Sequence, residues 1–131
     1  MKRFVLPAAI VALGFSGGGF ALADAQTQAS APKPRACFYV RGVNSFREAG
    51  DQTVYLRSGV RDIYRLDLMH RCPDLKWALG IGLDTHGSWV CDPLDVTVIA
   101  GSSIGPQRCP VKAVSKLTRD EAAALPRKHR P

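Results

Sequence analysis

The stretch of sequence that decides the fold is Thr53-Val54-Tyr55-Leu56-Arg57-Ser58-Gly59-Val60-Arg61-Asp62-Ile63-Tyr64-Arg65-Leu66-Asp67-Leu68. Its two halves, Thr53–Arg57 and Asp62–Leu68, are rich in β-branched and aromatic residues and alternate between apolar and polar positions. This period of two is typical of strands that are buried on one face. Because Ser58-Gly59 between them is a turn signal, the stretch predicts an antiparallel hairpin. The side chains expected on its buried face are Tyr64, Leu66 and Leu68.

Further strands are expected on both sides of this hairpin. The segments that indicate them are Phe38–Val40, Ala78–Leu83, Ser88–Cys91, Asp95–Ala100 and Val111–Leu117. The turn residues Asp84–Gly87 predict that the second and third of these segments form another hairpin. The segment Gly101–Pro110 is expected to be a loop.

Only two segments have helical character. Cys72–Trp77 is expected to make one turn, and Thr118–Leu125 carries a capping box, with Thr118 as N-cap and Glu121 three residues later. Pro126 ends that helix. The predicted fold is therefore mostly β: a small antiparallel sheet, rolled or sandwiched, with a short C-terminal helix and two disulfides.

The N-terminus has the three parts of a secretory signal peptide. Met1-Lys2-Arg3 is positively charged, Phe4–Phe20 carries no charge, and Ala21-Leu22-Ala23 is an A-x-A cleavage signal. We expect cleavage after Ala23 or Ala25, and an exported protein, periplasmic or secreted, without a transmembrane span. The expected organisation is a signal peptide (1–23), a flexible linker (24–35), a disulfide-linked β-rich domain (36–125) and a basic tail (126–131).

The four cysteines are predicted to form two disulfides. They are Cys37, Cys72, Cys91 and Cys109, separated by 35, 19 and 18 positions, with no C-x-x-C pair. Zinc and thioredoxin-like sites need close pairs of cysteines, so this spacing argues against metal and redox roles. A domain of about 90 residues is marginally stable without such cross-links. Four cysteines allow three connectivities, and their spacing does not choose between them.

The charge of the chain favours acidic partners. The whole sequence has a net charge of +7, and removal of Lys2 and Arg3 with the signal peptide leaves about +5. We expect an acidic envelope component rather than a specific nucleic acid. The candidate ligand surface comprises Arg57, Arg61, Arg65 and Tyr55, with Arg71, Tyr39 and Tyr64 nearby in sequence. Hairpin faces often have this composition without any ligand. The cluster Arg127–Arg130 is expected to be a solvated tail.

Other residue patterns carry little catalytic signal. Gly101-Ser102-Ser103-Ile104-Gly105 matches G-x-S-x-G, but the residues after it cannot begin the helix that a nucleophile elbow needs. Asp84 and His86 lie in a predicted turn. We therefore expect no catalytic residue, metal ligand or cofactor; the alternative is a small hydrolase or redox enzyme with a site near Asp84 and His86. Trp77 and Trp89, each near a cysteine, are expected in the core.

A longer series of segments resembles a known family. These segments are Cys37, Thr53–Leu56, Val60–Leu68, Cys72–Leu75, Val90-Cys91, Asp95-Val96, Cys109–Val114 and Leu117-Thr118. Over about residues 36–125 the chain resembles the domain-of-unknown-function family 6491 of small exported bacterial proteins. The resemblance implies no assigned activity and no catalytic residues. It also implies the disulfides Cys72–Cys109 and Cys37–Cys91.

The expected function is that of an exported small domain of the bacterial envelope. The sequence shows no convergent set of nucleophile, base and oxyanion donors, so a non-enzymatic binding or structural role is favoured over the hydrolase or redox alternative.

Overall fold

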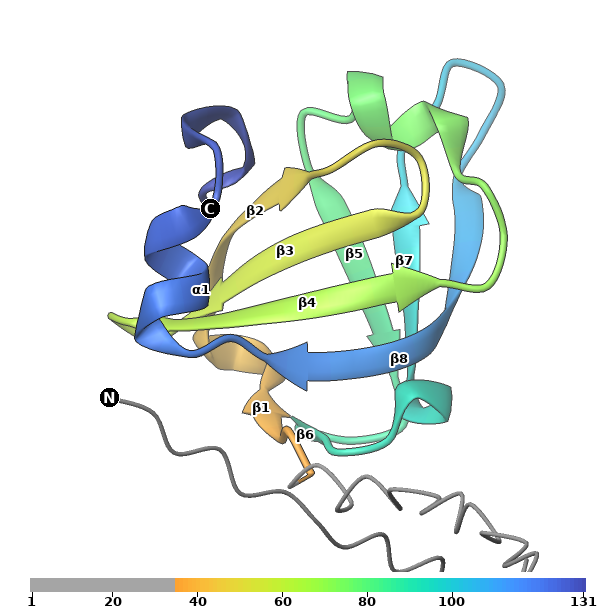
Figure 1. The fold of residues 1–131 in the computed structure, drawn as a ribbon. Helices are drawn as coiled ribbons and strands as arrows, with labels where there is room; N and C mark the ends of the chain where they lie inside the picture. Colours follow the sequence, from red (N-terminus) through yellow and green to blue (C-terminus); the bar gives the residue numbers. More distant parts are fainter. Residues whose placement is uncertain (1–34) are drawn as a thin grey trace, which may run out of the picture. The chain divides into compact units, whose positions relative to one another are not determined.

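The computed structural model describes residues 35–131 (Figure 1). The predicted signal peptide and the predicted linker up to residue 34 lie outside the described residues. Within the described part of the chain, no helix is long and apolar enough to cross a membrane.

One curled antiparallel sheet of six strands makes up most of the fold (Figure 1). In spatial order the strands are β2 (Val43–Glu48), β3 (Thr53–Ser58), β4 (Asp62–Leu68), β8 (Gln107–Lys116), β7 (Val96–Ala100) and β5 (Ile81–Thr85). A second, two-stranded sheet pairs β1 (Phe38–Tyr39) with β6 (Trp89–Val90). The prediction of a mostly β, antiparallel fold is therefore confirmed.

The predicted first hairpin is confirmed as β3 and β4. The two strands are paired from Thr53 opposite Asp67 to Ser58 opposite Asp62. The turn between them contains Gly59 at a φ of 69°, a left-handed conformation that glycine adopts without a steric penalty. Period-two alternation buries the expected face of β4. Its three buried side chains are Tyr64, Leu66 and Leu68.

The core lies inside the curl of the sheet. Both sheets and the η2 segment supply its large fully buried side chains, among them Phe38, Val54, Leu56, Leu66, Leu68, Leu75, Val90, Val98 and Val111. Leu75 comes from η2 (Pro73–Trp77), a 3₁₀ helix where one helical turn was expected. Two further 3₁₀ turns are η1 (Val40–Gly42) and η3 (Pro93–Asp95).

The predicted second hairpin is wrong. β5 pairs with β7, from Ile81 opposite Ala100 to Thr85 opposite Val96, and β6 pairs with β1 instead. The Asp84–Gly87 segment therefore leads from one sheet to the other. A turn signal indicates only the local direction of the chain. The strand that pairs with β5 is instead β7, which lies further along the sequence.

The last strand is longer than expected, and one strand was missed. β8 begins at Gln107 inside the predicted loop and continues through Pro110. Its first part, up to Pro110, pairs with β7, and the part from Val111 onward pairs with β4. Pro110 thus lies where β8 changes partner, next to the register irregularity at Asp67 and Leu68. At such an irregularity a strand tolerates proline, which has no amide hydrogen to donate. The missed strand is β2.

The C-terminal helix begins as predicted. In α1 (Arg119–Ala124) the Thr118 hydroxyl accepts a hydrogen bond from the Glu121 amide at 3.2 Å. The Glu121 carboxylate in turn accepts from the Thr118 amide at 2.7 Å, which completes the capping box.

The basic segment after the helix is bonded to the rest of the fold, although Arg127, Lys128 and Arg130 are exposed. It forms a 3₁₀ turn, η4 (Arg127–His129), whose His129 Nδ1 lies 2.6 Å from the main-chain oxygen of Glu48 in β2. The Arg130 guanidinium donates to the carbonyl oxygens of Ala123 at 2.6 Å and Leu125 at 2.8 Å, which would otherwise be unsatisfied at the end of α1. These bonds hold the segment against the helix and β2.

Candidate functional site: two exposed tryptophans beside the disulfides

All four cysteines are bonded in two disulfides, Cys37–Cys91 and Cys72–Cys109. This is the connectivity that the family resemblance implied. The first bridge joins the residue before β1 to the residue after β6, and the second joins the residue before η2 to β8. Cys72 and Cys109 are buried in the core, whereas Cys37 and Cys91 are half-buried at its edge.

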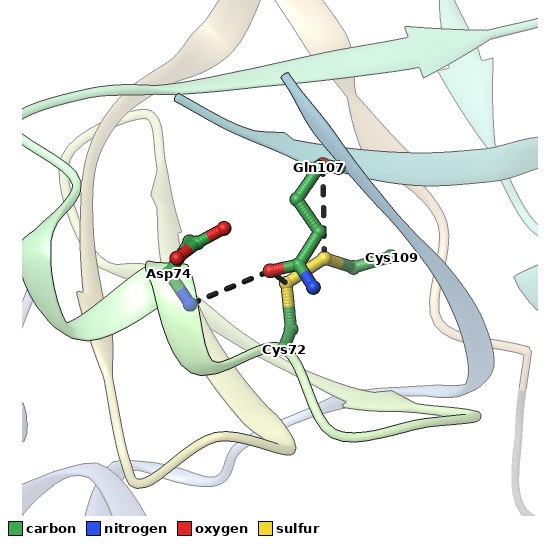
Figure 2. Close-up of a disulfide and its surroundings, with 4 residues drawn as sticks. All are labelled: Cys72, Asp74, Gln107 and Cys109. Carbon is green, nitrogen blue, oxygen red and sulfur yellow. Dashed lines mark hydrogen bonds between the residues drawn. A yellow bond between two sulfur atoms is a disulfide. The ribbon is translucent and has the colours of Figure 1, made fainter. Parts of the chain in front are cut away.

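A glutamine side chain reinforces the buried bridge (Figure 2). The Gln107 Oε1 accepts a hydrogen bond from the main-chain amide of Asp74 at 3.4 Å. The same oxygen lies 3.2 Å from the Cys72 sulfur, but a disulfide sulfur carries no proton, so this is a sulfur–oxygen contact and not a hydrogen bond. The start of η2 is therefore fixed to β8 covalently and through an amide.

The tryptophan that ends η2 is not in the core. Trp77 is 82% exposed, so the prediction that it is buried is wrong. It lines an open groove of about 520 Å³ between the η2–β5 segment and the β7–β8 loop. The residues that line this groove are Asp74, Trp77, Leu79, Gly80, Gly101, Ser102 and Ser103. The two segments are neighbours because Ile81 and Ala100, which follow Gly80 and precede Gly101, are paired.

The second tryptophan is exposed as well. Trp89 on β6 is 61% exposed, which again contradicts the expected core position. Its indole packs against the ring of Tyr39 on β1, with ring centroids 5.3 Å apart and the planes tilted by 46°. Phe38 and Val90, their neighbours in the two strands, are fully buried. The alternation of β1 and β6 thus places one aromatic pair outside while anchoring its backbone in the core.

The predicted ligand surface is not assembled as one free patch. Tyr55 and Arg65 are register partners on β3 and β4, but the Arg65 guanidinium donates to the Asp67 carboxylate at 2.9 Å, and this hydrogen bond raises the pKa of Arg65. The Arg57 guanidinium donates to the main-chain oxygen of Pro131. Arg61 is exposed in the turn between the two strands. Two of the four residues therefore have partners within the protein.

The turn that carries Arg61 is bonded to η1, the segment that follows Tyr39. The Gly59 amide donates to the carbonyl oxygen of Gly42 at 2.8 Å, which holds the β3–β4 turn against η1. Arg41 is exposed within η1, two residues after Tyr39. We call these four exposed residues on neighbouring segments, Tyr39, Trp89, Arg41 and Arg61, the basic-aromatic end. Sequence reasoning selected Arg61 but missed Arg41 and Trp89, because no local pattern indicates the pairing of β1 with β6.

Neither arginine of the basic-aromatic end has an internal partner among residues 35–131. The hydrogen bonds and ion pairs found there involve other basic residues. Arg71 forms an ion pair with Asp51 at 2.6 Å, and the hydrogen bond from Arg71 holds the pKa of Asp51 below its usual value. Arg41 and Arg61 thus retain all their donors for a ligand.

The residues of the catalytic alternative make structural contacts. The Asp84 carboxylate forms an ion pair with Arg108 of β8, and the His86 amide donates to the carbonyl oxygen of Asp95 at 3.4 Å. The G-x-S-x-G segment forms a turn in which the Gly105 amide donates to the carbonyl of Ser102. The strand β8 follows it, rather than the helix that a nucleophile elbow requires.

Comparison with known proteins identifies the family but no characterised relative. No curated protein and no solved structure matches the chain. The sequence pattern of the Family of unknown function (DUF6491) matches residues 1–131, the whole chain. The protein therefore belongs to this family, whose function is unknown.

Proposed function

We propose that this protein is an exported, non-enzymatic binding domain of the bacterial envelope, and that it binds an acidic envelope component at the basic-aromatic end. The observation that carries the proposal is the exposed Tyr39–Trp89 ring pair, with Arg41 two residues after Tyr39 and Arg61 in the turn bonded to η1, neither arginine having an internal partner within residues 35–131. Arginine forms bidentate hydrogen bonds with phosphate and carboxylate groups, and exposed rings contact the less polar parts of the same ligand. The four side chains are thus complementary to an anionic ligand.

The disulfides support export. Disulfides form and persist in oxidising compartments and are rare in the reducing cytosol. Both bridges also join segments that carry the exposed tryptophans, so oxidation supports the geometry of these surfaces as well as the core.

The contacts of the candidate catalytic groups favour binding over catalysis. Asp84, the acid of the alternative site, has its carboxylate held by Arg108. A catalytic acid or base needs a carboxylate or ring placed within reach of a substrate and tuned by its surroundings. The ion pair gives Asp84 a structural role that accounts for its position.

Export can be tested by producing the full chain in a bacterial host and measuring its mass and location. We expect a periplasmic or secreted product that begins near Asp24 or Gln26 and resists thiol alkylation unless it is first reduced. A product that keeps residues 1–23 in the cytoplasm, or that has free thiols after export, would contradict this part of the proposal.

Binding can be tested by retention of the oxidised protein on immobilised lipopolysaccharide, peptidoglycan and heparin across a salt gradient. We expect retention at low salt that Arg41→Gln/Arg61→Gln abolishes and Trp89→Ala weakens. The matched control is Arg47→Gln/Arg119→Gln, which removes the same charge from exposed positions elsewhere. If the control loses retention equally, only net charge matters; if the unaltered protein is never retained, the domain is structural.

A further inference from the structure

We infer that the groove beside Trp77 is a second binding site, for an uncharged chain of pyranose sugars. This site goes beyond the proposed function and does not depend on it. The groove and the basic-aromatic end lie at opposite ends of the β5–β7 ladder: Ile81 and Ala100 are paired next to the groove, and Thr85 and Val96 are paired at the other end, from which the chain continues to β6.

The lining of the groove combines the groups that sugar recognition requires. Its volume of about 520 Å³ lies within the usual range for small-ligand sites. Trp77 presents an exposed indole face, and an apolar ring face is the surface on which the C–H face of a pyranose can pack. Hydroxyl groups around the edge of a sugar need hydrogen-bond partners, and the groove offers Asp74 on the same segment as Trp77 and two serines on the β7–β8 loop.

Three polar side chains that line the groove are available to form hydrogen bonds with a ligand. Among the described residues, the Asp74 carboxylate has no hydrogen-bond or ion-pair partner, since only its main-chain amide is engaged, by Gln107. The Ser102 hydroxyl accepts from the Ile104 amide at 3.3 Å, which leaves its own hydrogen free to donate. Ser103 lines the same wall. An acceptor and two hydroxyls thus line the same groove as the indole of Trp77.

The charge of the groove sets the ligand class. A carboxylate in the lining repels phosphate and carboxylate groups but accepts hydrogen bonds strongly from sugar hydroxyls. An uncharged saccharide therefore fits this groove better than the acidic ligand proposed for the basic-aromatic end. Gly80 and Gly101 also line the groove and carry no side chain that would occupy it.

The groove is also held in place before any ligand binds. The Cys72–Cys109 bridge and the Gln107 amide fix the start of η2, and the fully buried Leu75 fixes its middle. A site whose parts are already positioned loses less entropy on binding. Trp77 therefore extends from a 3₁₀ helix whose backbone is held in place, although its own side chain is exposed.

The test uses the oxidised protein with the substitution Trp89→Phe. Because the sequence has two tryptophans, Trp77 is then the only one that remains. Titration with chitotetraose and with cellotetraose, in separate arms, should change the Trp77 fluorescence saturably, and the better arm tells whether N-acetyl groups contribute. In the two-tryptophan protein, followed by calorimetry, Trp77→Ala should weaken binding about tenfold or more and Asp74→Asn by several-fold. The matched control Trp89→Ala should bind as the unaltered protein does.

Three results would overturn the inference. One is the absence of any fluorescence or heat change up to about 10 mM of either sugar, a concentration well above that expected for even a weak specific site. Another is sugar binding that persists undiminished in Trp77→Ala. The third is co-sedimentation with neutral phosphatidylcholine vesicles that Leu79→Ser/Ile104→Ser abolishes, because these exposed apolar side chains would then mark a lipid-binding end instead. Each result leaves the salt-dependent retention at the basic-aromatic end unaffected.

Discussion

Removing each disulfide in turn tests how the bridges stabilise the fold. In the chain-entropy treatment, the Cys72–Cys109 bridge, with a sequence separation of 37, contributes about 3.8 kcal/mol. The Cys37–Cys91 bridge, with a separation of 54, contributes about 4.2 kcal/mol. By loop closure alone, the loss of Cys37–Cys91 should therefore destabilise the protein slightly more.

The burial of Cys72 and Cys109 reverses the expected order of destabilisation. Cys72 and Cys109 are 0% and 4% exposed, so replacing both with alanine also removes two sulfur atoms from the core. Each is comparable to a buried methylene, about 0.8 kcal/mol, with an added cost for the cavity that remains. We expect Cys72→Ala/Cys109→Ala to lower the free energy of unfolding by about 5–6 kcal/mol, and Cys37→Ala/Cys91→Ala by about 4 kcal/mol.

The measurement is urea unfolding of both double variants and the unaltered protein at about 25 °C, followed by far-UV circular dichroism. Because small domains have a net stability of about 5–15 kcal/mol, this loss amounts to between about a third and all of the stability, and at the lower end of the range the core variant has no folded baseline. That result, with a transition retained in the other variant, agrees with the expected order. A greater loss in Cys37→Ala/Cys91→Ala would refute the reasoning that core burial outweighs loop length.

Three other changes test the core, the helix and an ion pair. Leu66→Ala removes a fully buried side chain of β4, and urea unfolding should show a loss of about 2–5 kcal/mol. Thr118→Ala removes half of the capping box and should cost about 1 kcal/mol, whereas Thr118→Ser should restore most of it. Arg71→Gln removes the hydrogen bond that lowers the pKa of Asp51, so NMR titration should show this pKa rising toward 3.8. A carboxyl whose pKa is lowered by folding stabilises the protein above its unfolded pKa and loses that contribution as the pH falls through its folded pKa. The stability of the Arg71→Gln variant should therefore decline less on acidification below about pH 4 than that of the unaltered protein.

Local signals in the sequence predicted the elements whose partners are adjacent in the chain. The β3–β4 hairpin follows from alternation and Gly59, and the start of α1 follows from Thr118 and Glu121. In both cases every group that decides the structure lies within a few residues. Such features depend on backbone preferences and nearby hydrogen bonds, which a single sequence displays directly.

The errors concern elements whose partners are distant in the chain. β2 was missed because its apolar residues, Val43 and Phe46, lie three positions apart and follow no strand period; it is an edge strand with a mixed burial pattern. β5 was paired with the wrong neighbour because the Asp84–Gly87 turn signal suggested a hairpin. The choice of β7 depends on the packing of the whole sheet, which local chemistry does not reveal.

The candidate sites were harder to predict than the fold. Arg57 was selected for its charge, but the segment that ends at Pro131 occupies it. Arg41, by contrast, was not selected, because its proximity to Trp89 requires the β1–β6 pairing. Whether a charged side chain is free for a ligand depends on which other segments fold over it, and that is a property of the tertiary structure.

The two tryptophans that were wrongly expected in the core indicate what the disulfides contribute beyond stability. An aromatic side chain near a cysteine is expected in the core because the core usually needs its apolar area. In this small domain the core near Cys72–Cys109 is completed by Leu75, and near Cys37–Cys91 by Phe38 and Val90. Since each bridge already constrains the backbone there, burial of the neighbouring indole is not needed to hold the segment. The cross-links thereby leave Trp77 and Trp89 exposed on positioned backbone, which is the arrangement that a binding surface requires.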